Sequence, residues 1–205
     1  MQHNKIFCIG LNKTGTSSLH EAFKILNYKS IHRIGKEGNI KIIIHQNYIN
    51  GNKLLKGIEN YDAYSDWNNA NTNFLFKKLD EQYPKSKFVL NTRDIDGWLN
   101  SREKHVKSIP ELRNKQAENP ENTWYNIDKK AWVKDYREHH RQVLNYFEDR
   151  EDDLLIFNLF DGDSWEKICD FLNRPVPKEP FPYANKSPNY IFKYYKKIKK
   201  IINLK

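Results

Sequence analysis

The stretch of sequence that decides the fold is Phe7-Cys8-Ile9-Gly10-Leu11-Asn12-Lys13-Thr14-Gly15-Thr16-Ser17-Ser18-Leu19. An apolar run ends at Gly10 and is followed by a short polar loop. After several hydroxyl residues, Leu19, Ala22 and Phe23 recur at helical spacing. This change from an apolar run to a glycine loop and then to an amphipathic pattern predicts a strand, a phosphate-binding loop and a helix.

The two glycines of this loop nearly match the nucleotide-binding pattern G-x-x-x-x-G-K-[ST]. Gly10 and Gly15 have the expected separation, but Thr16 stands at the lysine position and the loop's own lysine is Lys13. An NTPase needs its lysine on the β- and γ-phosphates. Lys13 would instead bring one mobile charge to an oxygen that becomes negative as a bond breaks. The simpler interpretation is an ordinary turn between a strand and a helix.

The loop has the chemistry of an anion site even without that charge. Backbone N–H groups at a helix N-terminus bind anions, and hydroxyl side chains add further donors. The candidate anion-binding residues of the loop are Asn12, Lys13, Thr14, Gly15, Thr16, Ser17 and Ser18.

A second candidate anion site follows a later apolar run. Residues 88–90 predict a short buried strand, and Arg93 lies just past its C-terminal end, where open α/β sheets bind ligands. A helix is expected to begin near Asp94, so Ser101 falls about two turns along it. An arginine and a serine in these positions can clamp one phosphate group. Alternatively, Arg93 forms an ion pair with Asp94 or Asp96 at the helix start.

Together, the two segments resemble the sulfotransferase superfamily. Its members carry a K-[ST]-G-T-[ST] loop for the 5′-phosphosulfate of 3′-phosphoadenosine 5′-phosphosulfate (PAPS), and this chain has Lys13-Thr14-Gly15-Thr16-Ser17. They also carry an arginine after a strand, and a serine eight positions later, for the 3′-phosphate; Arg93 and Ser101 have that separation. The resemblance extends over residues 4–188. The further segments that look like a soluble, bacterial-type branch are 61–67, 79–84, 165–172 and 175–187.

The resemblance implies a fold, a donor and a reaction. The fold is α/β, a P-loop-like three-layer arrangement with a mostly parallel central sheet and helices on both faces. The reaction is transfer of a sulfuryl group from PAPS to a hydroxyl or amine, with adenosine 3′,5′-bisphosphate (PAP) as the product. No metal is required, because Lys13 and the loop amides stabilise the charge that magnesium stabilises in an NTPase. Lys186 resembles a late basic residue that closes over the 3′-phosphate.

Such a reaction needs a general base for the acceptor proton. Sulfotransferases place it at the end of the strand before the arginine–serine segment, often as a histidine. Here that position falls in residues 64–67, which contain no histidine. Asp66 is the candidate base and Asp62 the second candidate; a carboxylate serves best where burial favours its protonated form. Asp66 could instead cap a helix expected from residues 68–74.

The remaining candidates are weaker. The histidines expected to face solvent or to have structural roles are His20, His139 and His140. The histidines that could line an acceptor cleft, although surface or core roles are more frequent, are His32, His45 and His105. Trp98 is expected in the core. Ser18 stands where many relatives have an aromatic residue for the adenine.

The chain has 205 residues and a net charge of +9, so nucleic acid has to be considered as a partner. Much of the excess charge lies in residues 191–205, which predict a basic amphipathic helix or tail after a domain spanning residues 1–190. This tail would pack on the domain or make a peripheral membrane contact. Aromatic and basic residues interleave only there, which disfavours nucleic acid.

Other sequence features concern the cellular location of the protein, the state of its cysteines and zinc binding. There is no apolar run of membrane-spanning length and no apolar signal region after Met1, so we expect a cytoplasmic protein. Cys8 and Cys169 lie in an apolar strand and an amphipathic helix, which predicts buried free thiols. No Cys/His spacing indicates a zinc site.

Strand and helix patterns alternate along the chain, which predicts a mostly parallel sheet with helices on both faces. The expected strands are residues 5–10, 61–65, 88–91 and 154–158. The expected helices are residues 16–26, 54–58, 74–83, 95–106, 132–148 and 165–172, the last with Ser164 as N-cap. Residues 42–44 fit either a helix or a strand.

Three functions are compatible with these patterns. The first is a PAPS-dependent sulfotransferase, the second a P-loop small-molecule kinase, and the third a non-catalytic basic protein that binds a nucleotide or nucleic acid. A kinase gives no reason for the pairing of Arg93 with Ser101. The acceptor would be a small molecule, a glycan or a glycolipid, in a pocket formed by residues 27–60 and 108–130. The sequence gives no indication of the oligomeric state.

Overall fold

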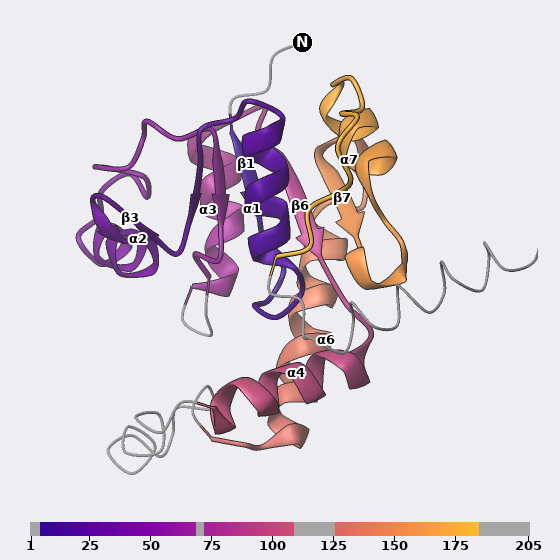
Figure 1. Cartoon of the computed structure of the whole chain (residues 1–205). Helices are drawn as coiled ribbons and strands as arrows, with labels where there is room; N and C mark the ends of the chain where they lie inside the picture. Colours follow the sequence, from indigo (N-terminus) through magenta and orange to yellow (C-terminus); the bar gives the residue numbers. More distant parts are fainter. Residues whose placement is uncertain (1–4, 69–71, 109–125, 185–205) are drawn as a thin grey trace, which may run out of the picture.

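The computed structural model describes residues 5–68, 72–108 and 126–184. Its main feature is a five-stranded sheet in the order β2-β5-β1-β6-β7, in which every neighbouring pair is parallel (Figure 1). The strands are β1 (Ile6–Cys8), β2 (Ser30–His32), β5 (Ala63–Ser65), β6 (Lys87–Asn91) and β7 (Leu154–Phe157). Because all strands run the same way, their carboxyl ends meet at one edge of the sheet.

Helices cover both faces of this sheet. The α-helices are α1 (Thr16–Ile25), α2 (Ile40–Ile49), α3 (Phe76–Gln82), α4 (Ile95–Lys107), α6 (Lys129–Tyr146) and α7 (Trp165–Leu172). The short 3₁₀ turns are η1 (Asn73–Leu75), η2 (Glu151–Asp153) and η3 (Leu159–Asp161). Successive side chains of a strand point to opposite faces. Accordingly, Ile6 and Cys8 pack with α1 and α7, whereas Phe7 and Ile9 pack with α2, α3 and α6. The three-layer α/β prediction is confirmed.

A smaller apolar cluster joins α4 to α6 beside the carboxyl edge. Trp98 and Trp132 are fully buried in it, so the expected core role of Trp98 is confirmed. The guanidinium of Arg102 lies 5.2 Å from the Trp98 ring centroid and 4.3 Å from that of Trp132. Burial lowers the pKa of Arg102 to about 10. This packing holds α4 against the rest of the domain.

The region between residues 27 and 60 differs most from expectation. β2 and the antiparallel hairpin of β3 (Ile34–Gly35) and β4 (Gly38–Asn39) were not predicted, because each strand is only two or three residues long. Residues 42–44 belong to a helix, α2. The helix expected at residues 54–58 is wrong, since this segment is a turn. Two of its backbone N–H groups bond to side chains at the end of α3. Leu54 N donates to Gln82 Oε1, and Leu55 N donates to the hydroxyl of Tyr83.

Other predictions can be compared directly. Ser164 does precede α7, but its hydroxyl donates to the Glu166 carboxylate at 2.6 Å instead of capping the helix. Both cysteines are buried free thiols, as expected. None of the helices in the described ranges combines the length and apolarity needed to cross a membrane. Residues 191–205, and most of the expected loop at 108–128, lie outside the described residues.

Candidate active site

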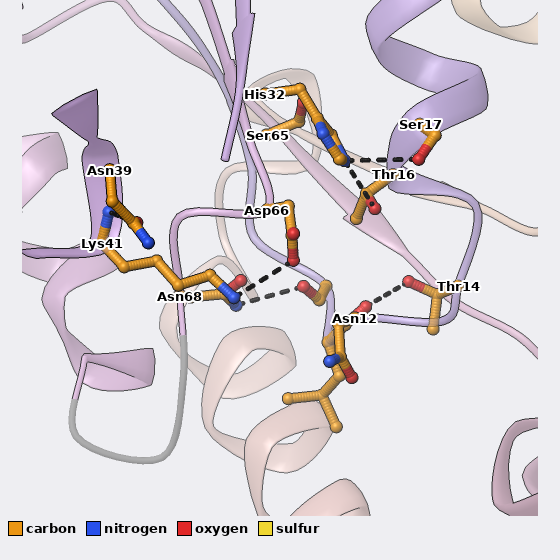
Figure 2. Close-up of polar contacts among 12 residues, drawn as sticks. Asn12, Thr14, Thr16, Ser17, His32, Asn39, Lys41, Ser65, Asp66 and Asn68 are labelled. Carbon is orange, nitrogen blue, oxygen red and sulfur yellow. Dashed lines mark hydrogen bonds and ion pairs between the residues drawn. The ribbon is translucent and has the colours of Figure 1, made fainter. Parts of the chain in front are cut away.

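The phosphate-binding loop runs from β1 to α1 at the carboxyl edge of the sheet (Figure 2). Gly15 is the N-cap of α1, with a left-handed φ of 97° and no side-chain cap bond. A side chain is strained in that conformation, which explains the glycine. The first N–H groups of a helix have no partner within the helix. With no capping side chain at Gly15, those of α1 are suited to hold an anion.

Asn91, at the end of β6, fixes the start of the loop. Its Oδ1 accepts a hydrogen bond from Gly10 N at 3.1 Å, and its Nδ2 donates to Thr14 Oγ1 at 2.5 Å. A Cβ on Gly10 would lie 1.8 Å from the Asn91 carbonyl oxygen, so only glycine fits there. Asn91 is fully buried and was not identified from the sequence. It ties the two strands that precede the two predicted anion sites.

Asn68 and His139 hold the carbonyl groups at the end of β1. Asn68 Nδ2 donates to both Ile9 O and Gly10 O at 3.1 Å. His139 Nε2 donates to Ile9 O at 2.6 Å from helix α6. Burial lowers the pKa of His139 to about 4, although the bond to Ile9 acts in the opposite direction. The structural role expected for His139 is therefore confirmed, and the neutral imidazole is part of the loop's scaffold.

The hydroxyl residues of the loop face different ways. The Thr14 hydroxyl is buried and donates to the carbonyl of Leu11, so it serves the loop itself. Thr16 Oγ1 and Ser17 Oγ lie 3.2 and 3.4 Å from Nε2 of His32 (Figure 2). Ser18 Oγ accepts a hydrogen bond from Ala184 N at 3.0 Å. Thus only Thr16 and Ser17 present hydroxyls next to a titratable group.

His32 is the last residue of β2, and the structure brings it to the phosphate-binding loop. Its ring lies 5.6 Å from that of His20, whose Nδ1 is 2.8 Å from Ser30 Oγ. Burial lowers the pKa of His32, the Asp66 carboxylate raises it, and the charges of Lys41 and Arg33 lower it. A neutral imidazole can accept a proton or a hydrogen bond.

Lys13 lies within the loop with a left-handed φ of 67°. Burial lowers the pKa of its ammonium, the Asp66 carboxylate raises it, and the Arg93 guanidinium lowers it. Asp66 and Arg93 follow different strands, yet both charges act on Lys13. The structure therefore brings the predicted lysine, carboxylate and arginine into one electrostatic site.

Arg93 lies after β6 and next to the first turn of α4. Its Nε is buried and donates no hydrogen bond to any described residue, although Asp94 Oδ2 lies 3.9 Å away. Its guanidinium carbon is 4.0 Å from the ring centroid of Phe160. A Cβ on Gly97 would lie 2.7 Å from Arg93 Nε, so the arginine packs closely against this glycine and a side chain would collide with it. Ser101 follows Gly97 by one turn and shares that face.

Helix α6 holds the backbone that carries Arg93. Tyr136 OH donates to Arg93 O at 2.6 Å and lies 2.8 Å from Thr92 Oγ1. His140 Nε2 is also 2.8 Å from Thr92 Oγ1, and burial lowers the pKa of this histidine. These contacts give His140 the structural role expected from the sequence.

The two carboxylate candidates lie at opposite edges of the sheet. Asp66 follows β5, so it is at the carboxyl edge, and its Oδ1 is 3.4 Å from Lys41 Nζ (Figure 2). Asp62 precedes β5 and accepts a hydrogen bond from Lys29 N at 2.7 Å. The alternative role of Asp66 as a helix cap is not supported. Among the described residues after Asp66, the first helical turn begins only at Asn73. Lys41 was not identified from the sequence.

The other sequence candidates are distributed as follows. His105 lies on α4; burial lowers its pKa, the charges of Lys13, Arg33 and Lys41 lower it further, and Asp66 raises it. His45 lies on α2, one turn after Lys41. Lys186 is outside the described residues. Within the described ranges, no group of three or more His, Cys, Asp or Glu side chains is arranged to hold a metal ion.

Comparison with known proteins identifies the family. The family model described as "Sulfotransferase domain" matches residues 5–190. The chain belongs to the sulfotransferase family. This sulfotransferase is 23% identical over 214 residues to "Ava biosynthesis cluster protein M" from Aspergillus versicolor, with 87% of this chain and 80% of that protein covered. Its structure is also similar to the crystal structure of a sulfotransferase from Alicyclobacillus acidocaldarius, with a TM-score of 0.48, 16% identity, and 92% and 88% of the two chains covered.

Proposed function

We propose that this sulfotransferase transfers a sulfuryl group from PAPS to a hydroxyl or amine of a small molecule, a glycan or a glycolipid. The observation that supports the proposal is that two groups of candidate anion-binding residues lie at one edge of the sheet. One is the loop at the N-terminus of α1, and the other is Arg93 with Ser101 on α4. PAPS has a 5′-phosphosulfate and a separate 3′-phosphate, so it needs two such sites.

The residues present fit this donor. The N-terminus of α1 has no side-chain cap and is suited to the 5′-phosphosulfate, together with Lys13, Thr16 and Ser17. Arg93 Nε is buried with no hydrogen-bonding partner among the described residues, and an anionic ligand would satisfy it. Ser101 lies on the same helix face and would complete the 3′-phosphate site. Lys186 is proposed for that site from the sequence alone.

Lys13 and Asp66 have distinct proposed roles in the chemistry. When bound, PAPS supplies the sulfuryl group and leaves as PAP. Lys13 stabilises the negative charge that develops on the oxygens held by the loop. Asp66, after β5, takes the proton from the acceptor hydroxyl or amine. His32 is a second candidate for this proton, because its imidazole lies beside Thr16 and Ser17.

The proposal is tested by a transfer assay in which PAP release is measured with PAPS as donor, a panel of hydroxyl and amine acceptors, and EDTA present. We expect acceptor-dependent PAP release without a divalent cation. Slow hydrolysis of PAPS serves as the readout if no acceptor in the panel reacts. No PAP release from PAPS, together with phosphorylation of an acceptor by ATP and magnesium, would favour the kinase alternative instead.

A further inference from the structure

Three charged residues at the carboxyl edge of the sheet have left-handed backbones. Lys13, Arg33 and Asp66 have φ angles of 67°, 57° and 54°. They follow β1, β2 and β5, which lie side by side in the sheet. The left-handed region costs a residue with a side chain roughly 1 kcal/mol. Such backbones cluster at functional sites, where the surrounding structure enforces them.

The backbone of Arg33 is enforced from both sides. Arg33 N donates to Ser65 O at 3.2 Å, and Arg33 O accepts from Ile40 N at 3.0 Å. The first bond ties it to the end of β5, next to Asp66. The second ties it to the first residue of α2, next to Lys41. Arg33 therefore has a fixed backbone between the two members of the Lys41–Asp66 ion pair.

The charges at this edge are not balanced. Lys41 Nζ lies 3.4 Å from Asp66 Oδ1, but the side chain of Arg33 makes no hydrogen bond or ion pair with any residue in the described ranges. Asp66 is only 9% exposed, and its Oδ1 accepts no hydrogen bond from the described residues. The edge thus combines a guanidinium without an anion and a buried carboxylate oxygen whose charge is met by the ammonium of Lys41.

The charge of Arg33 is on an exposed side chain, whose backbone is bonded to Ser65 and Ile40. It lowers the pKa of both His32 and His105, which lie on β2 and α4, and the charge of Lys41 acts on both in the same direction. An exposed guanidinium in this position is available to an anion that enters the site. We call Arg33, Lys41 and Asp66 the acceptor edge.

We propose that the acceptor is itself an anion: it carries a carboxylate or another acidic group that binds Arg33, with Lys41 adjoining, while its hydroxyl or amine is presented to Asp66. This inference rests on the proposed function and adds the chemical class of the acceptor. A planar guanidinium binds carboxylate, phosphate and sulfate groups through paired hydrogen bonds. Binding the acceptor through its anionic group would place its reacting atom near the carboxylate of Asp66.

The experiment measures how strongly an acid is preferred over its neutral amide in the complex with PAP. The probes are acid–amide pairs on three scaffolds: 4-hydroxybenzoate, 4-hydroxyphenylacetate and methyl glucuronide. Each is titrated by calorimetry into protein saturated with PAP. One charge-assisted hydrogen bond corresponds to roughly a 10- to 100-fold preference for the acid on the scaffold that binds best. Equal binding of acid and amide on every scaffold, or no binding of any probe, would overturn the proposal.

Variants connect the preference to the acceptor edge. Arg33→Gln should reduce the preference to about 1, and Arg33→Gly should do the same while adopting the left-handed backbone without strain. Lys85→Gln is the matched control, because Lys85 is an exposed residue with φ 64° in the turn between α3 and β6. A preference that survives in both Arg33 variants would contradict the proposal. A separate calorimetric titration of PAP into each protein distinguishes failure of this proposal from failure of the proposed function. If the unmodified protein does not bind PAP, the proposed function itself is contradicted.

Discussion

The phosphate-binding loop and the acceptor edge are built in different ways. The loop is held by buried, uncharged groups, namely Asn91, Asn68 and the neutral imidazole of His139. The acceptor edge consists of charged residues with left-handed backbones after β2 and β5 and a lysine from α2. The difference indicates that this fold fixes its anion cradle with neutral hydrogen bonds. Lys13 is the loop's own charged residue with a left-handed backbone, so the contrast lies in the neutral groups that hold the loop, whereas the acceptor edge consists of charged residues alone.

The largest expected effect is at the acceptor edge. Asp66→Asn should reduce turnover by roughly 10²–10⁴, because an amide cannot take the acceptor proton. Asparagine tolerates the left-handed φ of 54°, so the fold and the PAP affinity should be retained. Turnover is measured by PAP release, and PAP affinity by calorimetry.

Asp62→Asn is the matched control for this change. Asp62 is at the opposite edge and bonds to Lys29 N, so its variant should keep near-full turnover. Loss of turnover in Asp62→Asn but not in Asp66→Asn would move the base to Asp62. If both variants remain active, the base lies outside this strand, and His32 is the next residue to test.

Lys13→Ala tests the loop side of the comparison. The amide cradle remains in this variant, but the charge beside the developing negative oxygens is lost. Turnover should fall by roughly 10²–10³, with a smaller change in PAP affinity. Unchanged turnover with much weaker PAP binding would show that Lys13 only binds.

The neutral scaffold of the loop predicts a pH dependence of stability. The pKa of His139 is lowered to about 4 in the folded protein, whereas an unfolded histidine titrates near 6.5. Between pH 4 and pH 6.5, the unfolded state therefore binds more protons at His139 than the folded state does. His139 should contribute stability above pH 6.5 that is lost as the pH falls towards 4, about 3 kcal/mol in all.

Urea unfolding at several pH values between 7 and 4 measures this loss. His139→Gln should be less stable than the unmodified protein at pH 7 and should show a weaker pH dependence. If the stability of this variant depends on pH as strongly as that of the unmodified protein, other groups cause the pH dependence. The neutral imidazole of His139 would then not be what holds Ile9.

The smallest expected effect concerns Arg93. Arg93→Gln should weaken PAP binding by roughly 10- to 100-fold through loss of charge-assisted hydrogen bonds. Binding of AMP, which lacks a 3′-phosphate, should change little. Equal losses for PAP and AMP would indicate that Arg93 supports the fold, for example through its contact with Phe160, and does not bind the 3′-phosphate.

The sequence predicted those parts of the protein that are local in the chain. The strand, loop and helix around Gly15 are encoded in one short stretch, and Arg93 and Ser101 share one helix start. Asn91, Asn68 and His139 could not be identified in this way, because they meet Ile9 and Gly10 only through the order of the strands and the docking of α6. Lys41 reaches Asp66 for the same reason. The turn at residues 54–58 was mistaken for a helix because its apolar residues pack on α3 at a spacing that resembles a helical one.

The most direct test of the account is a calorimetric comparison of PAP, ADP and AMP without magnesium. Two separate anion sites at one sheet edge predict that PAP binds more tightly than either nucleotide that lacks a 3′-phosphate. ADP carries an additional phosphate on the 5′ side only, so it separates the number of phosphates from their placement. Tighter binding of PAP is the predicted result. Equal affinities for PAP and ADP would contradict the account.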